Sequence, residues 1–242
     1  MKLNEGLVFC SDSRTNAGPD RVSTYSKLHR FSIHEDRQIA ILTAGNLGTT
    51  QAVISQIERD LQVDAESSLQ NAAYVSDIAD YIGELSVKTQ QKYAPTGPNA
   101  GFTASASFIV GGQIKGNPPE LYMIYPEGNH IRTSEQYPFI QIGETKYGKP
   151  ILDRIVRKET PHEHAIRCAL VSMDSTMRSN ATVGPPIEVL FIHDGGLTGS
   201  YYKKFEDNDD YLISLRESWD KNLVRAFNVL PPVDNVVEKD SE

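Results

Sequence analysis

The sequence has 242 residues, of which 39% are hydrophobic and 23% are charged, as in ordinary soluble globular proteins. Its net charge of −8 argues against a nucleic-acid surface, because phosphate binding requires clustered lysine and arginine. No apolar stretch is long enough to span a membrane, and the first residues lack the apolar segment of a secretory signal. We therefore expect a cytoplasmic protein that binds neither nucleic acid nor membrane. Cys10 and Cys168 lie far apart in apolar stretches, which favours reduced core thiols.

The first half of the chain predicts strands followed by helices. Short apolar or alternating segments between turn-forming residues predict strands over 6–10, 24–33 and 38–44. Apolar residues then recur at helical spacing, which predicts an amphipathic helix that begins near Thr49 and a second helix over about 71–93.

The second half repeats this order and ends in a polar tail. Strands are predicted over 103–111, 120–125, 129–133 and 139–142, with hairpin turns between them. Helices over 147–156 and 162–177, a strand over 187–193 and a last helix over 215–227 follow.

This order has no regular alternation of strand and helix, so helices packed on antiparallel sheets fit better than a parallel sheet. We predict an α+β protein of four layers, an αββα sandwich. It forms one domain over 1–233, and the acidic residues 234–242 form a loose tail.

The first predicted strand runs directly into Ser11, Asp12, Ser13 and Arg14. Opposite charges at the end of a buried strand are costly unless they are paired or face a site. Two interpretations stay open at this point: an exposed strand-end ion pair of little energetic value, or a functional site.

The order of several segments resembles the proteasome β-subunit branch of the N-terminal-nucleophile hydrolases. The shared features are the Asp-Ser-Arg sequence, Lys27 downstream of it, and Thr43-Ala44-Gly45 before a helix. The runs SDSRTNAG, LTAGNLGTTQAV and QIGETKYGKPILDR, with the MDSTMRSN region, are similar to the bacterial proteasome-like peptidases called Anbu. The resemblance covers nearly the whole chain and implies the four-layer αββα fold.

The resemblance implies roles for five residues. Lys27 would lower the pKa of a nucleophilic hydroxyl, Asp12 would hold Lys27 in place, and the Gly45 N–H would stabilise the oxyanion. Thr43 and Leu47 would flank Gly45 and contact the side chain before the cut bond, with a preference for small or apolar groups. Lys27 on a solvated strand face and Gly45 as a simple turn glycine remain alternatives.

The nucleophile of the family is the hydroxyl of an N-terminal threonine, with its own α-amino group as the base. The resemblance places this threonine a few residues upstream of Met1, and a methionine thioether cannot replace it. We therefore expect the printed chain to be inactive. It is either the later part of a threonine-type endopeptidase, which we favour because Asp12, Lys27 and Gly45 remain, or a catalytically silent scaffolding subunit.

Three further catalytic candidates depart from the family pattern. Glu144 stands where most proteasome β subunits have a serine, and Asp174 and Ser179 match an aspartate and serine only approximately. Ordinary roles at helix ends explain Glu144 and Asp174 equally well. The resemblance implies no organic cofactor, although a magnesium or sodium ion near Ser179 would fit the family. The expected partners are further copies of the chain, in a ring or open spiral, and peptide or unfolded protein substrates.

Overall fold

The computed structural model describes residues 1–16, 22–93 and 103–231. The turn residues near Gly18, the segment after the second helix and the predicted tail over 234–242 lie outside the described residues. No described helix is long and apolar enough to cross a membrane.

The described strands form two large antiparallel sheets and a small hairpin. The strands of the first sheet, in spatial order, are β1 (Lys2–Leu3), β2 (Gly6–Ser11), β10 (Ile187–His193) and β11 (Ser200–Phe205). The strands of the second sheet are β5 (Leu28–Ile33), β6 (Arg37–Gly45), β7 (Ala106–Ile114), β8 (Glu120–Ile124) and β9 (His130–Arg132). The hairpin consists of β3 (Arg14–Asn16) and β4 (Val22–Thr24).

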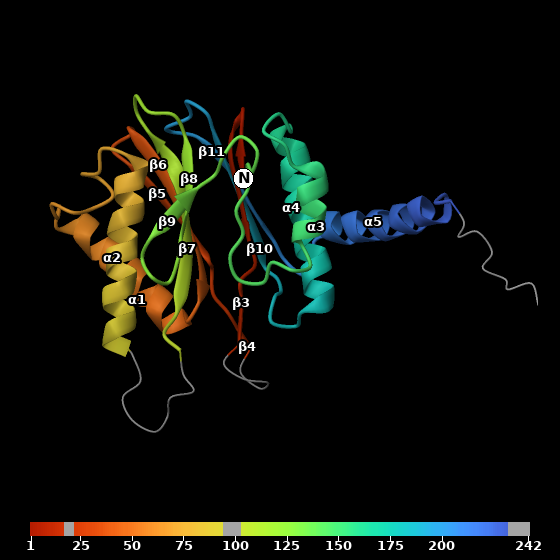
Figure 1. Ribbon diagram of the computed structural model, residues 1–242, viewed down its shortest axis with the longest axis horizontal. Coiled ribbons are helices and arrows are strands. Elements are labelled where there is room, and N and C mark those ends of the chain that lie inside the picture. The colour runs from red at the N-terminus through yellow and green to blue at the C-terminus, as the bar shows by residue number, and fades with distance from the viewer. Residues whose placement is uncertain (17–21, 94–102, 232–242) are drawn as a thin grey trace, which may run out of the picture.

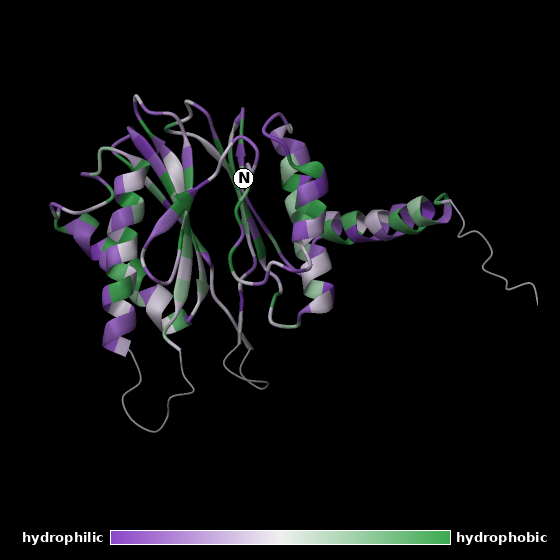
Figure 2. Cartoon of the chain, in the orientation of Figure 1, coloured by the Kyte–Doolittle hydropathy of each residue, from purple (hydrophilic) through white to green (hydrophobic). Residues whose placement is uncertain are grey.

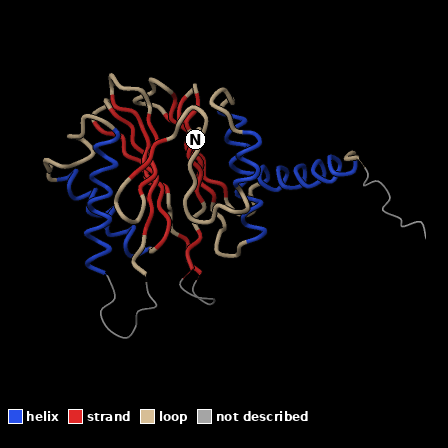
Figure 3. Tube along the Cα trace, viewed as in Figure 1, coloured by secondary structure: helices blue, strands red, loops and turns tan. Residues whose placement is uncertain are grey.

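Helices cover the outer face of each sheet. Helices α1 (Leu47–Gln62) and α2 (Val75–Tyr93) lie against the five-stranded sheet, and α3 (Lys149–Ile155) and α4 (His162–Ser179) lie against the four-stranded sheet (Figure 1). Figure 3 shows the resulting order of helix, strand, strand and helix layers. The predicted four-layer αββα architecture is confirmed.

The core follows these layers, and hydrophobic residues alternate with hydrophilic ones along both the helices and the strands (Figure 2). One cluster fills the space between the second sheet and α1 and α2, and includes Ile57, Ile82 and Phe108. A second cluster lies between the two sheets and includes Phe9 and Leu190. Because side chains alternate along β10, Leu190 and Ile192 face the second sheet, whereas Ile187 and Val189 face the helices.

Helix α5 (Asp210–Asn228) projects away from the layers (Figure 1). Of its residues, only Leu212 is fully buried, and several apolar side chains are exposed: Ile213, Leu223, Val224 and Phe227. This helix begins earlier than predicted, because the Asp209 carboxylate accepts hydrogen bonds from the backbone N–H groups of Tyr211 and Leu212 and caps its start.

Two strand predictions were wrong. Residues 139–142 form a loop that pairs with no strand. Phe139, Ile140 and Ile142 are apolar because they pack against core clusters from this loop. The strand predicted over 24–33 begins only at Leu28, so Lys27 lies in the short connection between β4 and β5. Strand β11 was not predicted.

Candidate active site

The structure holds one large cavity among the described residues, with a volume of about 590 Å³. Residues from β2, β5 and β6 line it together with α1, α4 and the loop over 140–144. Six residues singled out from the sequence are among them: Asp12, Lys27, Thr43, Gly45, Leu47 and Glu144. Met1 also lies on this wall. The carboxylate, amine and backbone groups predicted to meet therefore face the same space.

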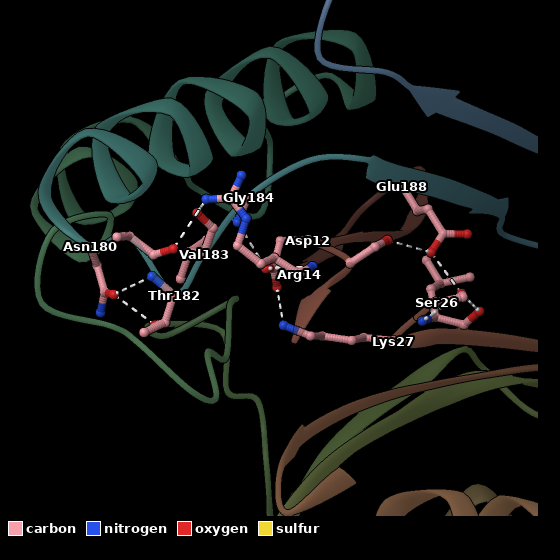
Figure 4. A network of polar contacts seen from close by, with 12 residues as sticks. Asp12, Arg14, Ser26, Lys27, Asn180, Thr182, Val183, Gly184 and Glu188 are labelled. Carbon is pink, nitrogen blue, oxygen red and sulfur yellow. Dashed lines mark hydrogen bonds and ion pairs between the residues drawn. The ribbon is translucent and has the colours of Figure 1, made fainter. Parts of the chain in front are cut away.

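Lys27 and Asp12 form an ion pair on the cavity wall. The distance from Lys27 Nζ to Asp12 Oδ1 is 2.6 Å, and the side chains are 23% and 11% exposed. Asp12 follows the end of β2 in one sheet, and Lys27 precedes β5 in the other, so the pair joins the two sheets (Figure 4). The interpretation of the Asp-Ser-Arg charges as an exposed strand-end pair is wrong, because Asp12 is buried and its partner is Lys27.

The second oxygen of the Asp12 carboxylate is held by the backbone. Asp12 Oδ2 accepts hydrogen bonds from the N–H groups of Arg14 at 3.2 Å and Gly184 at 3.1 Å. A carboxylate that accepts three donors is fixed in orientation, so Lys27 is presented to the cavity from a rigid anchor.

Arg14 fixes the loop that supplies the Gly184 donor. Its Nη1 atom donates to the carbonyl oxygens of Ala181 at 3.1 Å and Val183 at 3.4 Å (Figure 4). The guanidinium packs so closely on Gly184 that a Cβ atom there would lie 2.2 Å from Arg14 Cζ. Arg14 was singled out only as part of the Asp-Ser-Arg sequence, and Gly184 was not predicted, because these residues are far apart in the sequence and only the fold brings them together.

Gly45 ends β6 beside the cavity in a conformation that favours glycine. Its φ is +102°, and a Cβ atom would lie 2.5 Å from the Ser105 carbonyl oxygen. Helix α1 begins directly afterwards, capped by the Asn46 side chain. This turn is by itself a sufficient reason for a glycine, so the oxyanion role of Gly45 remains a prediction.

Thr43 and Leu47 lie on either side of Gly45 on the cavity wall. The Thr43 backbone N–H donates to the Lys27 carbonyl oxygen at 3.0 Å, which fixes the Lys27 main chain against β6. The substrate contacts of Thr43 and Leu47 remain a prediction; both residues line the cavity.

Glu144 lies on the cavity wall but is occupied by local hydrogen bonds. It accepts from the Lys146 backbone N–H at 3.1 Å and from Asn180 Nδ2 at 3.0 Å. These contacts, the Lys146 N–H first, lower the pKa of Glu144. The side chain thus ties the loop over 140–144 to the C-terminal end of α4.

The structure does not bring Asp174 and Ser179 to the cavity. Asp174 is buried between helices, where Oδ1 pairs with Arg216 Nε at 2.6 Å and Oδ2 with Arg178 Nε at 3.2 Å. It therefore connects α4 to α5. Ser179 is exposed at the end of α4. No group of three or more His, Cys, Asp or Glu residues suited to a metal ion occurs in the described part of the chain, the region of Ser179 included.

Cys10 is the cavity's only thiol among the described lining residues, and it is unsuited to nucleophilic attack. Burial first, and the nearby Asp12 charge second, raise the pKa of the Cys10 thiol to about 12. A thiol with such a pKa carries almost no thiolate at neutral pH.

The α-amino nitrogen of Met1 lies in the same region. It donates to the Val8 carbonyl oxygen at 2.7 Å, and burial lowers its pKa to about 5. At neutral pH this amine is therefore uncharged and is held by a backbone hydrogen bond.

Two polar residues near the cavity were missed because their partners are distant in sequence. Ser26 donates to Glu188 Oε2 at 2.6 Å, immediately beside Lys27 (Figure 4). The sequence feature that could have indicated this contact is Glu188, the single acidic residue in the apolar run that begins at Ile187.

Solved structures with the same fold cover nearly all of this chain. Anbu from Yersinia bercovieri is 37% identical, with 97% of each chain covered and a TM-score of 0.90. The helical assembly of the Anbu complex from Pseudomonas aeruginosa is 42% identical, with 98% of each chain covered and a TM-score of 0.92. Anbu from Hyphomicrobium sp. strain MC1 is 37% identical, with 97% of each chain covered and a TM-score of 0.88.

None of the curated proteins compared with the chain is significantly similar to it. The profile of the proteasome subunit family matches residues 1–192, which include both sheets up to β10 and the cavity described above. The chain therefore belongs to the proteasome subunit family.

Proposed function

We propose that the chain is a threonine-type peptidase subunit that hydrolyses peptide bonds through an N-terminal threonine supplied by residues preceding Met1. The observation that carries this proposal is the Lys27–Asp12 ion pair on the wall of a cavity of about 590 Å³. A largely buried ion pair is weak evidence for stability, since desolvation offsets most of the attraction. Its position against open space is better explained by chemistry in that space.

In the proposed mechanism, the threonine hydroxyl attacks the substrate carbonyl carbon and its proton passes to the threonine's own α-amino group. The Lys27 ammonium, held by Asp12, stabilises the oxygen as it loses this proton, and the Gly45 N–H donates to the oxyanion. The protonated amine then gives its proton to the leaving peptide nitrogen. Water cleaves the acyl ester and restores the hydroxyl. Thr43 and Leu47 contact the side chain before the cut bond.

The burial of the Met1 amine supports an extended N-terminus. Because burial lowers its pKa to about 5, a charged amine in this place is strongly disfavoured. A peptide bond at the same nitrogen would keep the hydrogen bond to the Val8 carbonyl and would carry no charge. Residues preceding Met1 would then continue along the wall that Met1 shares with Lys27.

We also propose that the subunit assembles with further copies of itself. The solved Pseudomonas aeruginosa protein, 42% identical, is described as a helical assembly. In the present chain, α5 projects from the body and exposes Leu223, Val224 and Phe227. Burying these side chains against another subunit would remove apolar surface from water.

A scaffolding subunit without chemistry is the second candidate. The observation that favours it is that Cys10, the one thiol among the described cavity-lining residues, is a poor nucleophile at neutral pH because its pKa is raised to about 12. This candidate predicts the same fold and the same assembly.

The deciding experiment uses the protein isolated from its source. Its N-terminal residue is determined by sequencing and intact mass, and hydrolysis is measured with a panel of fluorogenic peptides. We expect an N-terminal threonine and measurable hydrolysis. An assembled protein that begins at Met1 and cleaves no peptide would establish the scaffold instead.

Substitution of Lys27 tests the mechanism in the same protein. Lys27→Ala is expected to reduce kcat by about a hundred-fold or more while assembly persists, because an electrostatic stabiliser of the transition state is lost. Lys149→Ala is the matched control, since Lys149 forms an exposed ion pair with Asp153 at 2.7 Å on α3. Undiminished hydrolysis in Lys27→Ala removes Lys27 from the mechanism.

A further inference from the structure

A buried carboxylate, Glu188, lies between the two sheets close to the cavity. Glu188 is 4% exposed and belongs to β10, where it shares the inner face with Leu190 and Ile192. Among the described residues, no lysine, arginine or histidine forms an ion pair with it. A buried charge without a cationic partner is costly, so the groups that donate hydrogen bonds to Glu188 are needed to stabilise it.

Hydroxyl groups satisfy this carboxylate. Ser26 and Tyr202 donate to it at 2.6 Å each, and Ser13 donates at 3.3 Å. Burial, and then the hydrogen bond to Glu188, raise the pKa of Tyr202 to about 12, so its hydroxyl remains a donor at neutral pH. Hydrogen bonds to a charged acceptor are stronger than those between neutral groups.

These contacts connect the two sheets on either side of Lys27. Glu188 belongs to the four-stranded sheet, and Ser26 lies in the connection that leads into β5 of the five-stranded sheet. Further along β5, the Arg30 guanidinium stacks on the Tyr202 ring, 3.8 Å from its centroid. Tyr202 lies on β11 of the first sheet. Glu188 therefore binds both Ser26, before β5, and Tyr202, on which Arg30 of β5 stacks, and these two contacts hold β5 against the first sheet.

The Lys27–Asp12 pair spans the same gap between the sheets. Its 2.6 Å separation requires that the connection carrying Lys27 stay close to the end of β2. The Thr43 N–H fixes the Lys27 carbonyl from the second sheet, and the Ser26–Glu188 bond fixes the preceding residue from the first sheet. Lys27 is thus the residue between two anchors, one on each sheet.

From this arrangement we propose that Glu188 is a positioning residue for Lys27. By binding the Ser26 hydroxyl, Glu188 fixes the connection before β5 and keeps the Lys27 ammonium on Asp12. The inference rests on the proposed function for its catalytic meaning, since Lys27 matters to catalysis only if the chain is a peptidase. Glu188 itself does not line the cavity and would not touch substrate.

The test measures the reactivity of each lysine amine in the full chain. Competitive labelling with acetic anhydride, followed by mass spectrometry, gives the rate at Lys27 relative to that at Lys149. We expect Ser26→Ala to raise the relative rate at Lys27 about five-fold, because it removes the hydrogen bond to Glu188 together with the local contacts to the Leu28 backbone and lets the ion pair open more often. Ser26→Thr keeps a hydroxyl and should restore the original rate.

Glu188→Gln tests the carboxylate, and Glu120→Gln is its matched control. Glu120 also accepts a tyrosine hydroxyl, from Tyr122 at 3.1 Å, but it lies on β8. We expect a raised Lys27 rate in Glu188→Gln and none in Glu120→Gln. If Glu188→Gln does not fold, Ser26→Ala and Ser26→Thr decide the question.

The outcomes separate this inference from a merely structural role and from the peptidase proposal. A structural role would lower the melting temperature but leave the Lys27 rate, relative to Lys149, unchanged in the folded protein; that result overturns the inference. Labelling needs no turnover. If the protein cleaves no peptide but the Lys27 labelling rate responds to these substitutions, only the proposed function is contradicted. If the protein cleaves peptides and the Lys27 rate does not respond, only this inference is contradicted.

Discussion

Lys27 Nζ and Asp12 Oδ1 lie 2.6 Å apart and join the two sheets at the cavity. The pair brings together the end of β2 and the residue before β5, with the other Asp12 oxygen held by the Gly184 N–H. Removal of one partner leaves the other group desolvated, whereas removal of both leaves no uncompensated charge.

A double-mutant cycle tests this relationship. Asp12→Asn and Lys27→Met are each expected to lower the free energy of unfolding by about 2 kcal/mol, since the pair is largely buried. The double variant should lose less than the sum, with a coupling energy of about 1–2 kcal/mol. Urea denaturation at neutral pH measures all four chains. Strictly additive losses would show that the two side chains do not interact in solution.

The close packing of Arg14 on Gly184 gives a second prediction. Gly184→Ala places a methyl group where the guanidinium lies, so Arg14 must move and lose its hydrogen bonds to Ala181 and Val183. We expect a loss of about 1–2 kcal/mol in the free energy of unfolding. Gly199→Ala is the control, because no atom lies within 4 Å of its added Cβ. Equal stability of the two variants would contradict the packing described.

The packing of Asp174 between helices gives a third prediction. Asp174→Ala removes the partner of Arg216 and Arg178 and should loosen α5, at a cost of about 1–2 kcal/mol because the arginines are partly exposed. Asp153→Ala, which breaks the exposed pair with Lys149, should change the stability by less than about 0.5 kcal/mol. Thermal unfolding and limited proteolysis at α5 measure both.

Asp174→Ala also distinguishes a structural role of Asp174 from a catalytic one. Since the side chain does not reach the cavity, peptide hydrolysis by an active form should persist in Asp174→Ala. A selective loss of kcat with an intact fold would return Asp174 to the catalytic candidates.

The sequence predicted the layers well because periodicity reports burial directly. Apolar residues at helical spacing located α1, α2 and α4, and β2, β6 and β10 were found from their apolar runs. The prediction for residues 139–142 was wrong because periodicity detects burial and not strand pairing. Ile140 and Ile142 are apolar since they cover the core between the sheets from a loop.

The site was predictable only where a resemblance supplied the pairing. Nothing local in the sequence connects Asp12 with Lys27, and the resemblance alone placed them together. Gly184 and Glu188 had no such support: Gly184 meets Asp12, and Glu188 meets Ser26, across more than half of the chain. Asp174 was misleading because an acid on a helix near a predicted site gives no sign of which way it faces.

Glu5 offers a prediction about pH. Its carboxylate accepts hydrogen bonds from the ring and the backbone N–H of His162, the first residue of α4. Pro161, at the N-cap position, contributes no side-chain hydrogen bond. Glu5, in the turn between β1 and β2, instead accepts a hydrogen bond from the first backbone N–H group of the helix and places a negative charge at its N-terminus. The side-chain hydrogen bond from His162 is the main cause that lowers the pKa of Glu5 below its ordinary value of 4.5.

A carboxyl group whose pKa is lower in the folded than in the unfolded state stabilises the fold above the unfolded pKa. This contribution disappears as the pH falls through the folded pKa. Glu5→Gln should therefore melt at a lower temperature than the unsubstituted chain at pH 6, and the difference should vanish well below pH 4.5. Because Glu5 is exposed, high salt should also reduce the difference. Glu66→Gln, at an exposed position between α1 and α2, should show no such dependence. Calorimetric melting of the three chains from pH 3 to pH 6 is the measurement, and a constant difference across that range would exclude the Glu5 carboxylate as its source.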